Sequence, residues 1–327
     1  MLSFLAISLI LVAINSIAAI GLNIQFGYAG MVNLMSITCV AVGGYVTMVL
    51  VLPPAGQTQD AYILGLNWPF PLGVLGGMAA AGLFGLVVGA LALRRVRAHY
   101  FAIVTFAVAE MTHQFVGDFK PLFNGPTGLS GLSLPFVDVV GFENYNYFYL
   151  GLSVAVLALV VLFAEYIRRR PFGRVLRAIR EDQDAVRAFG RDVYRLQLLA
   201  FVIGSVLAGL AGGLLVGFTG TLDPSGWSSL ETLALLTGLI LGGAGNNFGV
   251  LLGMFVVAGV ITQGVTFLPS GLIPNTIQSP VEVMVYGALL ILILRFRPSG
   301  LIPERPGRDK VGSERSTLQP VPLAADR

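Results

Sequence analysis

The sequence is poor in the residues with which enzymes and metalloproteins do their chemistry. Among its 327 residues are one cysteine, two histidines and two lysines. The single Cys39 cannot form a disulfide within the chain or a Cys-based metal site, and two histidines are too few for a His-rich one. No G-x-x-x-x-G-K-[ST], H-E-x-x-H or G-x-S-x-G pattern occurs, which excludes a Walker-type nucleotide site, a zincin helix and a nucleophile elbow. We therefore predict that the chain is not an enzyme, holds no metal or cofactor, and depends on another subunit or an ion gradient for energy.

Charge is also scarce. Only 11% of the residues are charged, whereas 55% are hydrophobic. Because a soluble chain of this length needs a largely polar exterior, this composition excludes an ordinary soluble domain and indicates a protein whose solvent is lipid. The basic residues occupy short segments between apolar runs, so they do not form the continuous basic surface that nucleic-acid binding requires. The 41 glycines, many in Gly-xxx-Gly pairs such as Gly209/Gly213 and Gly249/Gly253, predict closely packed helices.

Long apolar runs fill most of the chain. A helix needs roughly 20 apolar residues to cross a hydrocarbon core of about 30 Å. Runs that approach or reach this length cover residues 2–20, 31–52, 72–93, 100–116, 148–167, 196–218, 230–241, 250–268 and 281–296. The seventh run is short and interrupted by glycines. The sequence therefore predicts an all-α fold, a polytopic bundle of about eight or nine transmembrane helices that occupies residues 1–298.

The distribution of Lys and Arg predicts the orientation of this bundle. Three basic residues lie at 94–97, nine at 168–195 and seven from 295 to the C-terminus, which leaves Lys120 alone. With nine crossings, the three groups fall on one side of the membrane and Lys120 on the other. The positive-inside rule makes the first side cytoplasmic, with the C-terminus inside and the N-terminus outside. Residues 299–327 contain several prolines and charges without apolar periodicity, so we predict a disordered cytoplasmic tail.

The connection at residues 168–195 is far longer than a simple link between two spans requires. Apolar residues recur in it at helical spacing: Val175, Ile179, Val186 and Phe189. This spacing predicts an amphipathic helix that ends at Gly190. An acidic cluster at 181–184 interrupts the basic residues, so the loop is not simply an anchor for anionic lipid. The helix could dock into a groove of a partner protein or lie on the membrane surface, and composition leaves both open.

Two stretches place glycine and asparagine between apolar runs. They are GLNIQFGYAGMVNL at 21–34 and LGGAGNNFGVLLG at 241–253. Interrupted helices in both halves of a transporter point to its translocation site, because non-helical backbone at membrane depth is tolerated where it lines a cavity or is buried. The alternative is that both stretches are ordinary short cytoplasmic turns.

One predicted span contains two ionisable residues, Glu110 and His113, one helical turn apart. Such residues are costly inside a membrane and are functional candidates by default. They could bond each other, bond another helix as a structural contact, or face a polar pathway. Asn15, Asn23 and Gln25 raise the same question more mildly, as does Asn33.

Several segments resemble a known family. They are GLNIQFGYAGMVNL at 21–34, LRRVRAHYFAIVTFAVAEM at 93–111, GPTGLSGL at 125–132, FGRVLRAIREDQDAVRAFGRDVYRLQLLAFVIGSVLAGLAGGL at 172–214, LILGGAGNNFGVLLG at 239–253 and FRPSGLI at 296–302. In this order they resemble the LivM-type second permease subunit of branched-chain amino acid ABC importers and its urea/amide relatives. The resemblance covers nearly the whole chain, and 172–214 is its most specific block.

The resemblance implies a bacterial inner-membrane importer. In it, two related permeases form the pathway, so a LivH-like second permease is expected, together with two cytoplasmic ABC ATPases and an extracytoplasmic binding protein that delivers substrate. The family's large cytoplasmic loop contacts the ATPase, so we call residues 168–195 the coupling loop. The matching residues here are Phe172, Gly173, Arg177, Arg180, Glu181, Asp184, Arg187 and Gly190. Candidates for the translocation pathway are Asn23, Gln25, Tyr28, Asn33, Glu110 and His113.

The chain also departs from the family pattern. After the GYAG turn the usual Gln, Ser, Gly and His are replaced by MVNLMS at 31–36. Because this region is expected to line the pathway, the departure leaves more than one substrate class open. Branched-chain amino acids lead, with urea and short amides as the alternative. A rival of another class, a self-sufficient channel or ion-coupled carrier, predicts transport by the isolated chain without ATP. A membrane-embedded enzyme ranks lowest because no nucleophile–base or metal constellation is visible.

Overall fold

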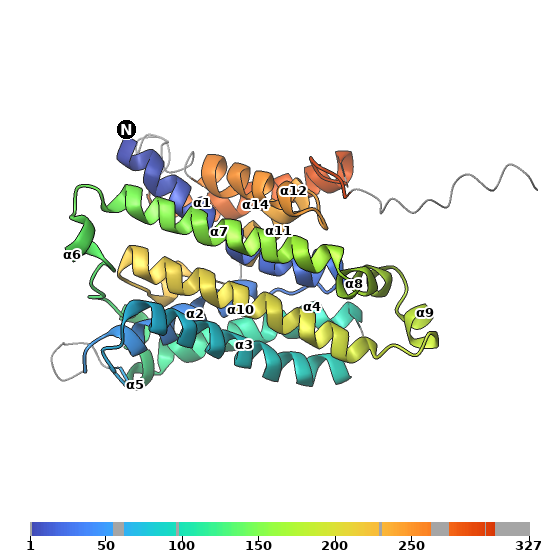
Figure 1. Cartoon of the computed structure of the whole chain (residues 1–327), viewed down its shortest axis with the longest axis horizontal. Helices are drawn as coiled ribbons and strands as arrows, with labels where there is room; N and C mark the ends of the chain where they lie inside the picture. The colour runs from blue at the N-terminus through green and yellow to red at the C-terminus, as the bar shows by residue number, and fades with distance from the viewer. Residues whose placement is uncertain are drawn as a thin grey trace, which may run out of the picture.

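The computed structural model describes residues 2–54, 62–95, 98–228, 231–262, 275–297 and 299–304. Within these ranges the chain consists of helices and their connections, with two isolated β-bridges and no β-strand. The long helices lie side by side along one axis of the molecule (Figure 1). The prediction of an all-α bundle is confirmed for the described part of the chain.

Helices are present at all nine predicted apolar runs. They are α1 (Leu2–Asn23), α2 (Ser36–Val51), α3 (Phe70–Arg95), α4 (Ala98–Asp118), α7 (Tyr145–Arg169), α10 (Val193–Thr219), α11 (Glu231–Gly242), α12 (Asn247–Met254) with its π-helical continuation η5 (Phe255–Ile261), and α14 (Asn275–Phe296). In the described part of the chain, four segments are both long and apolar enough to cross a membrane: Ser3–Tyr28, Phe70–Arg94, Tyr145–Arg169 and Val193–Thr219. The number of crossings stays a prediction, because α11 is only 12 residues long.

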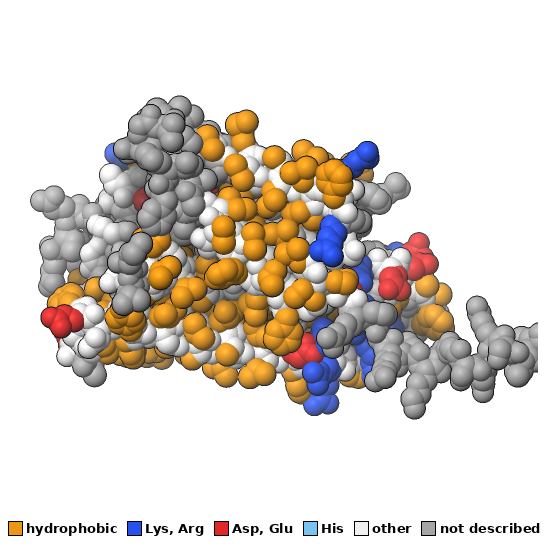
Figure 2. All heavy atoms as spheres, turned by 90° about the horizontal axis from the view of Figure 1, so that it is seen from above, with side chains coloured by type: hydrophobic (Ala, Val, Ile, Leu, Met, Phe, Trp, Pro, Cys, Tyr) orange, Lys and Arg blue, Asp and Glu red, His pale blue; other side chains and the backbone are white. Residues whose placement is uncertain are grey.

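The bundle has two chemically different ends (Figure 1). One end carries α8 (Pro171–Glu181), α9 (Gln183–Ala188) and residues 299–304, and we call it the basic end. The opposite end carries the N-terminus and the short helices α5 (Lys120–Phe123) and α6 (Val137–Val140). In Figure 2 the side of the bundle between the ends is largely apolar, and most of the visible Lys and Arg side chains lie toward the basic end. A face with an apolar middle and charged margins is what a bilayer requires.

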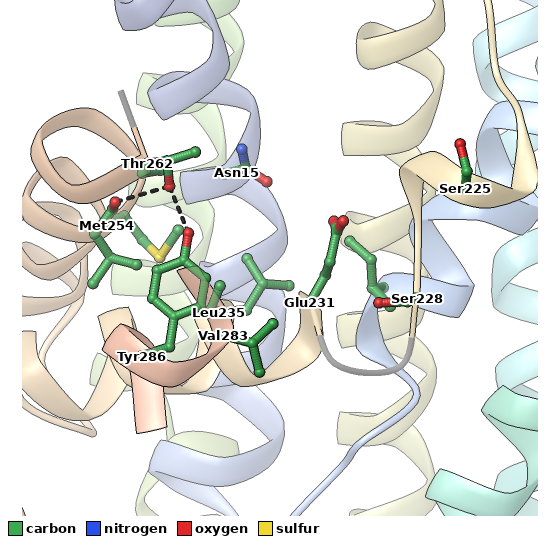
Figure 3. A pocket seen from close by; sticks show the side chains of 13 residues that line it. Asn15, Ser225, Ser228, Glu231, Leu235, Met254, Thr262, Val283 and Tyr286 are labelled. Atoms are coloured by element: carbon green, nitrogen blue, oxygen red, sulfur yellow. Dashed lines mark hydrogen bonds between the residues drawn. The ribbon is translucent and has the colours of Figure 1, made fainter. Parts of the chain in front are cut away.

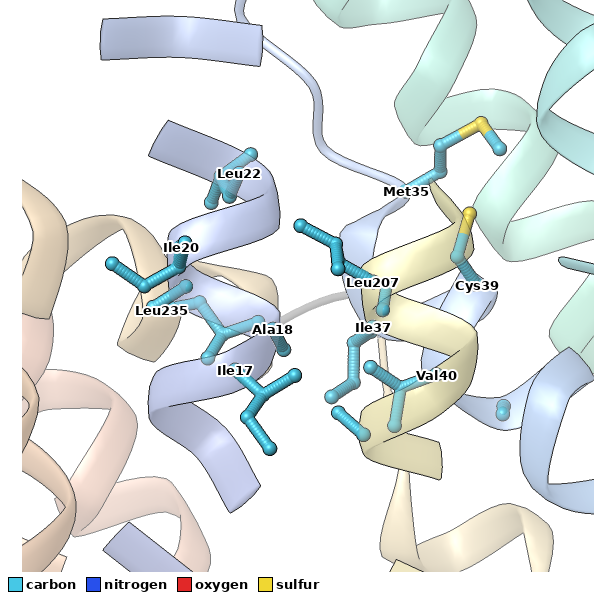
Figure 4. Packing of buried hydrophobic residues seen from close by; sticks show 14 of the residues in the cluster. Ile17, Ala18, Ile20, Leu22, Met35, Ile37, Cys39, Val40, Leu207 and Leu235 are labelled. Atoms are coloured by element: carbon cyan, nitrogen blue, oxygen red, sulfur yellow. The ribbon is translucent and has the colours of Figure 1, made fainter. Parts of the chain in front are cut away.

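Helix α10 lies at the centre of the packing and contacts α1, α2 and α3. A Cβ built at Gly43 would overlap the backbone of Gly209, and one built at Gly212 would overlap the carbonyl oxygen of Val40. Backbones approach this closely only where glycine leaves room, and in the predicted pairs a Cβ at Gly77 or Gly253 would likewise overlap a backbone carbonyl oxygen. Buried aliphatic side chains of α1, α2, α10 and α11 fill the remaining space, as Figure 4 shows for Ile17, Val40 and Leu207.

The coupling loop forms two helices where the sequence predicted one. Asp182 is extended, and its carboxylate accepts hydrogen bonds from the backbone N–H groups of Asp184 (2.9 Å) and Ala185 (3.0 Å). It therefore ends α8 and caps α9. The restart shifts the helical register, so Val186 is buried whereas the side chain of Phe189 is 86% exposed. Gly190 follows with φ +74°, the left-handed conformation of a helix stop, as predicted.

Residues 299–304 begin the segment that we predicted to be a disordered tail, and they pack against the bundle. The N–H of Leu301 donates to the carbonyl of Leu241 (2.7 Å), and the N–H of Ile302 donates to that of Gly242 (3.0 Å). Gly300, at φ +75°, allows this close approach to Gly243. The rest of the predicted tail, 305–327, lies outside the described residues.

Candidate functional site

The first interrupted stretch begins after a complete crossing. Helix α1 has 22 residues, or about 33 Å at 1.5 Å per residue, and it then widens into the π-helical turn η1 (Ile24–Tyr28). Gly30, at φ +70°, ends this turn against the side chain of Arg180 on α8. The second stretch turns through Gly243 and Gly245, both at positive φ, beside residues 299–304. Both interruptions therefore lie at the basic end, where they form short turns between helices, and the cytoplasmic location of this end stays a prediction.

The two interruptions, more than 200 residues apart in sequence, are joined by buried hydrogen bonds. The side-chain oxygen of Asn247 accepts bonds from the Asn23 amide (3.0 Å) and the Tyr28 hydroxyl (2.8 Å). The side-chain oxygen of Asn23 accepts from the N–H of Gly245 (2.9 Å). Because each buried polar group here has a partner, these bonds fix the turn after α1 against the turn between α11 and α12.

A second pair of bonds continues from the same turn. The Gln25 amide donates to the carbonyl of Phe201 on α10 (2.8 Å) and accepts from the Asn33 amide (2.7 Å). We call Asn23, Gln25, Tyr28, Asn33 and Asn247 the polar cluster, and all five are buried. The structure thus brings together four of the six predicted pathway residues. Their role in translocation stays a prediction, which the geometry does not test.

Two arginines of α8 face inward onto this region. Arg180 donates to the carbonyl oxygen of Gly27 and pairs with Glu304 (2.8 Å between Nη2 and Oε2). Arg177 pairs with the other carboxylate oxygen of Glu304 (3.5 Å) and donates to the carbonyl of Arg168 (3.2 Å). Glu304 therefore holds both arginines, and Arg180 connects α8 directly to the turn after α1.

The remaining predicted coupling residues divide between the outer face of the loop and its attachment. Glu181, Asp184 and Arg187 are exposed, and the last two pair with each other (2.8 Å). Phe172 is half-buried against the core. Gly173 is buried where a Cβ would overlap the carbonyl of Ile167, so glycine is required at the corner between α7 and α8.

Glu110 and His113 lie on α4, apart from the polar cluster. The His113 ring is 2.9 Å from the carbonyl of Pro224 through Nε2, and it packs edge-on against Trp227, with ring centroids 5.1 Å apart. These partners belong to the connection between α10 and α11, so His113 fastens α4 to the opposite end of the bundle. Glu110 is half-buried one turn before it. The structure does not bring these two residues together with the other four.

A cavity of about 600 Å³ lies between α1, α11, η5 and α14, and we call it the main cavity (Figure 3). Its lining includes polar side chains, Asn15, Ser225, Ser228, Glu231, Thr262 and Tyr286, as well as aliphatic ones. Asn15 was considered from the sequence but was not among the predicted pathway residues, and the other polar residues of this lining were not predicted at all. A carboxylate opening an otherwise apolar run, as Glu231 does, was the signal that could have identified this wall.

Replacing Asn247 with alanine is expected to destabilise the protein. The change leaves the buried Asn23 amide and Tyr28 hydroxyl without their shared acceptor, at a cost of about 1–3 kcal/mol for an unsatisfied buried group. Thermal unfolding of the detergent-solubilised protein should show a lower midpoint. The control is Asn144→Ala, at an exposed helix start whose side chain makes no capping bond. Equal midpoints for the two variants would contradict the assigned network.

Comparison with known proteins agrees with the architecture. The model of the family described as "Branched-chain amino acid transport system / permease component" matches residues 4–294. A probable branched-chain amino acid transport permease protein LivM of Methanocaldococcus jannaschii is 31% identical over 319 residues, covering 89% of this chain and 90% of the relative. The high-affinity permease proteins LivM and LivH of Escherichia coli K12 are 28% and 26% identical, and each alignment covers 90% of this chain.

No solved structure matches the chain significantly. The family match spans most of the sequence, including α1, α2 and the coupling loop, and the relatives of both permease types align over nearly its whole length. The chain is therefore a multi-pass membrane protein and belongs to the family of permease components of branched-chain amino acid transport systems.

Proposed function

We propose that this chain is a membrane-spanning subunit of an ABC importer for branched-chain amino acids. In this proposal an extracytoplasmic binding protein delivers the substrate, a second, LivH-like permease completes the pathway, and two cytoplasmic ABC ATPases supply the energy. The relatives named as branched-chain amino acid permeases support the substrate class. Residues 1–298 would form the transmembrane domain in a bacterial inner membrane, and residues 299–327 would lie in the cytoplasm.

The observation that carries the proposal is the construction of the coupling loop. Its inner face is attached to the permease through Arg177, Arg180 and buried aliphatic residues, while its outer face presents charged residues. Phe189 stands among the exposed charges with 86% of its side chain accessible. An exposed aromatic ring surrounded by polar residues is typical of the centre of a protein–protein contact. We therefore place the ATPase on this outer face rather than lipid.

Movement of the ATPase would reach the transport pathway through the inner face. Arg180 contacts the turn after α1, and Glu304 belongs to the segment that pairs with the end of α11. A displacement of α8 therefore acts on α1 and α11 together. We propose that these two helices reorient in an alternating-access cycle, with the polar cluster as the joint between them. Glu110 and His113 would serve at the outward end, where binding protein docks.

Substituting Phe189 with alanine is expected to weaken ATPase binding at least tenfold without changing the fold, because the ring makes little contact within this chain. The measurement is the amount of ATPase that copurifies with the tagged permease in mild detergent. Phe142→Ala is the matched control, since Phe142 is 78% exposed just before α7 at the opposite end. Normal ATPase recovery with the Phe189 variant would exclude this docking surface.

A further inference from the structure

We infer that the main cavity is a binding station for the substrate on the translocation pathway, in which Glu231 and Asn15 receive the ammonium group of an amino acid. The inference rests on the proposed function and adds to it a site, its residues and the chemical group that it recognises. It concerns none of the pathway candidates selected from the sequence.

The volume and lining of the cavity suit a small amphiphilic molecule. About 600 Å³ falls within the roughly 300–1,000 Å³ typical of small-molecule sites. Aliphatic side chains, among them Ile37, Leu235 and Val257, line it together with the polar groups. Figure 3 shows Leu235 and Val283 between Glu231 and the pair of Thr262 and Tyr286, so a ligand there meets both apolar and polar surface. A branched aliphatic amino acid matches both kinds of surface, whereas a uniformly polar solute leaves the aliphatic lining without a partner.

The charge in the lining of the main cavity determines which end of an amino acid binds there. Among the described lining residues Glu231 is the only charged one. Asn15 lies on the facing helix, and its amide nitrogen already donates to the carbonyl of Leu11 (3.0 Å), which leaves its oxygen as an acceptor. Figure 3 shows the Asn15 and Glu231 side chains among those that line the cavity. Two acceptors, one of them a carboxylate, complement an ammonium group and disfavour a second carboxylate.

Most hydroxyl groups of the lining already donate a hydrogen bond within the chain. Thr262 donates to the carbonyl of Val257 (3.1 Å), so in its bond with Tyr286 (2.7 Å) the tyrosine hydroxyl is the donor, and Ser225 donates to Asp223. Toward a ligand these oxygens act as acceptors, so the lining favours the ammonium end of an amino acid and does not fix its carboxylate. The site would therefore hold the substrate through its ammonium group with moderate affinity, as suits a station from which the substrate must leave.

A smaller cavity of about 190 Å³, the side cavity, adjoins the first. It shares Asn15, Ile37 and Glu231 with the main cavity and reaches Trp227 at the opposite end of the bundle. Glu231 thus stands where the two spaces meet. Both cavities border the connection between α10 and α11 at the opposite end, the side cavity through Trp227 and the main cavity through Ser225 and Ser228.

The two acceptors lie on α1 and α11, and the contacts of the coupling loop with the bundle reach both of these helices. Asn15 lies on α1, two turns before Asn23, and Glu231 begins α11, which ends at Gly242 beside Ile302. A shift of α1 relative to α11 at the basic end would change the separation of Asn15 and Glu231 at the cavity. Release of the ammonium group could thereby be tied to movement of the ATPases.

The test uses the complete importer, with both permeases, the ATPases and the binding protein, reconstituted in proteoliposomes. Glu231→Gln keeps the size of the side chain and removes its charge. We expect leucine uptake to fall at least tenfold, while ATP hydrolysis stimulated by leucine-loaded binding protein stays within twofold of the wild type. The matched control, Glu143→Gln, removes an exposed carboxylate just before α7 and should transport normally.

A second measurement examines recognition directly. In the assembled transporter without binding protein, leucine should raise the unfolding midpoint of the wild type, whereas 4-methylpentanoate, which lacks the ammonium group, should not. Leucine should have no effect on the Glu231→Gln transporter. Ala234→Phe, which fills the cavity and keeps the carboxylate, should also abolish uptake, so the inference stays testable if the first variant misfolds.

The outcomes separate this inference from the proposed function. If the wild-type importer takes up leucine with ATP and both cavity variants do so equally well, the binding station is wrong and the importer assignment stands. If the wild-type importer takes up no branched-chain amino acid, the assignment itself is wrong. Equal stabilisation of wild type and Glu231→Gln by leucine would also overturn the ammonium site.

Discussion

Replacement of Gly212 by leucine is expected to prevent the protein from accumulating in folded form. A Cβ alone at this position would overlap the carbonyl oxygen of Val40, and backbone cannot rotate away as a side chain can. Helices α2 and α10 would have to separate, at a cost of about 3 kcal/mol or more, the upper end of typical overpacking penalties. The measurement is the monodisperse fraction of a fluorescent fusion in size-exclusion chromatography.

Gly151→Leu is the control for this substitution. Gly151 also lies in a long apolar helix, α7, but a Cβ there meets nothing within 4 Å. Added leucine at this exposed position should face lipid and leave the elution profile unchanged. If the Gly212 variant elutes like the wild type, the close contact between α2 and α10 is not present in the membrane.

Replacement of Arg180 by alanine is expected to uncouple ATP hydrolysis from transport. The change removes the bond from α8 to Gly27 and one of the two ion pairs of Glu304, while the outer face of the coupling loop remains intact. ATPase binding and hydrolysis should therefore persist. Uptake of leucine per ATP hydrolysed by the reconstituted importer should fall at least tenfold, because α8 would move without carrying the turn after α1.

The control is Arg174→Ala on the same helix. Arg174 is exposed, so its loss leaves the inner attachment unchanged. The variant should keep the wild-type ratio of uptake to hydrolysis even if it binds the ATPase less tightly. An unchanged ratio in the Arg180 variant would show that force passes from α8 to the bundle by another route.

The positions of the helices followed from the sequence because lipid imposes a simple requirement on it. A segment that crosses a bilayer must be continuously apolar, and the described structure has helices at all nine such runs. The clustering of arginines gave the basic end, and the Gly-xxx-Gly pairs gave the close packing around α10. These are properties of single segments, so one sequence suffices to show them.

Contacts between distant segments could not be predicted in the same way. Nothing in the periodicity of either interrupted stretch indicates that Asn23 and Asn247 bond each other, or that Glu304 reaches Arg177 and Arg180. Such contacts depend on how helices are placed in three dimensions. The prediction that Phe189 lies on the apolar face of one continuous helix was wrong for a local reason. The cap at Asp182 resets the helical register before Phe189, so its side chain is exposed.

The cavity lining was missed because its residues come from many separate elements along the chain. Glu231 stands at the start of a short apolar run, where an acidic residue looks like an ordinary helix start. Its importance follows only from the position of Asn15 on a facing helix and of Thr262 and Tyr286 beyond it. Polar residues like these form a site only because the fold brings them together, and one sequence does not show which residues meet.

If this chain forms a transport pathway driven by ATPases bound to its coupling loop, transport requires the assembled importer. The test is uptake of radiolabelled leucine into proteoliposomes that contain either the purified chain alone or the chain with the second permease, the ATPases and the binding protein. We expect uptake only with the complete set and hydrolysable ATP. Leucine uptake by the isolated chain without ATP would contradict the importer assignment and would identify a self-sufficient channel or carrier.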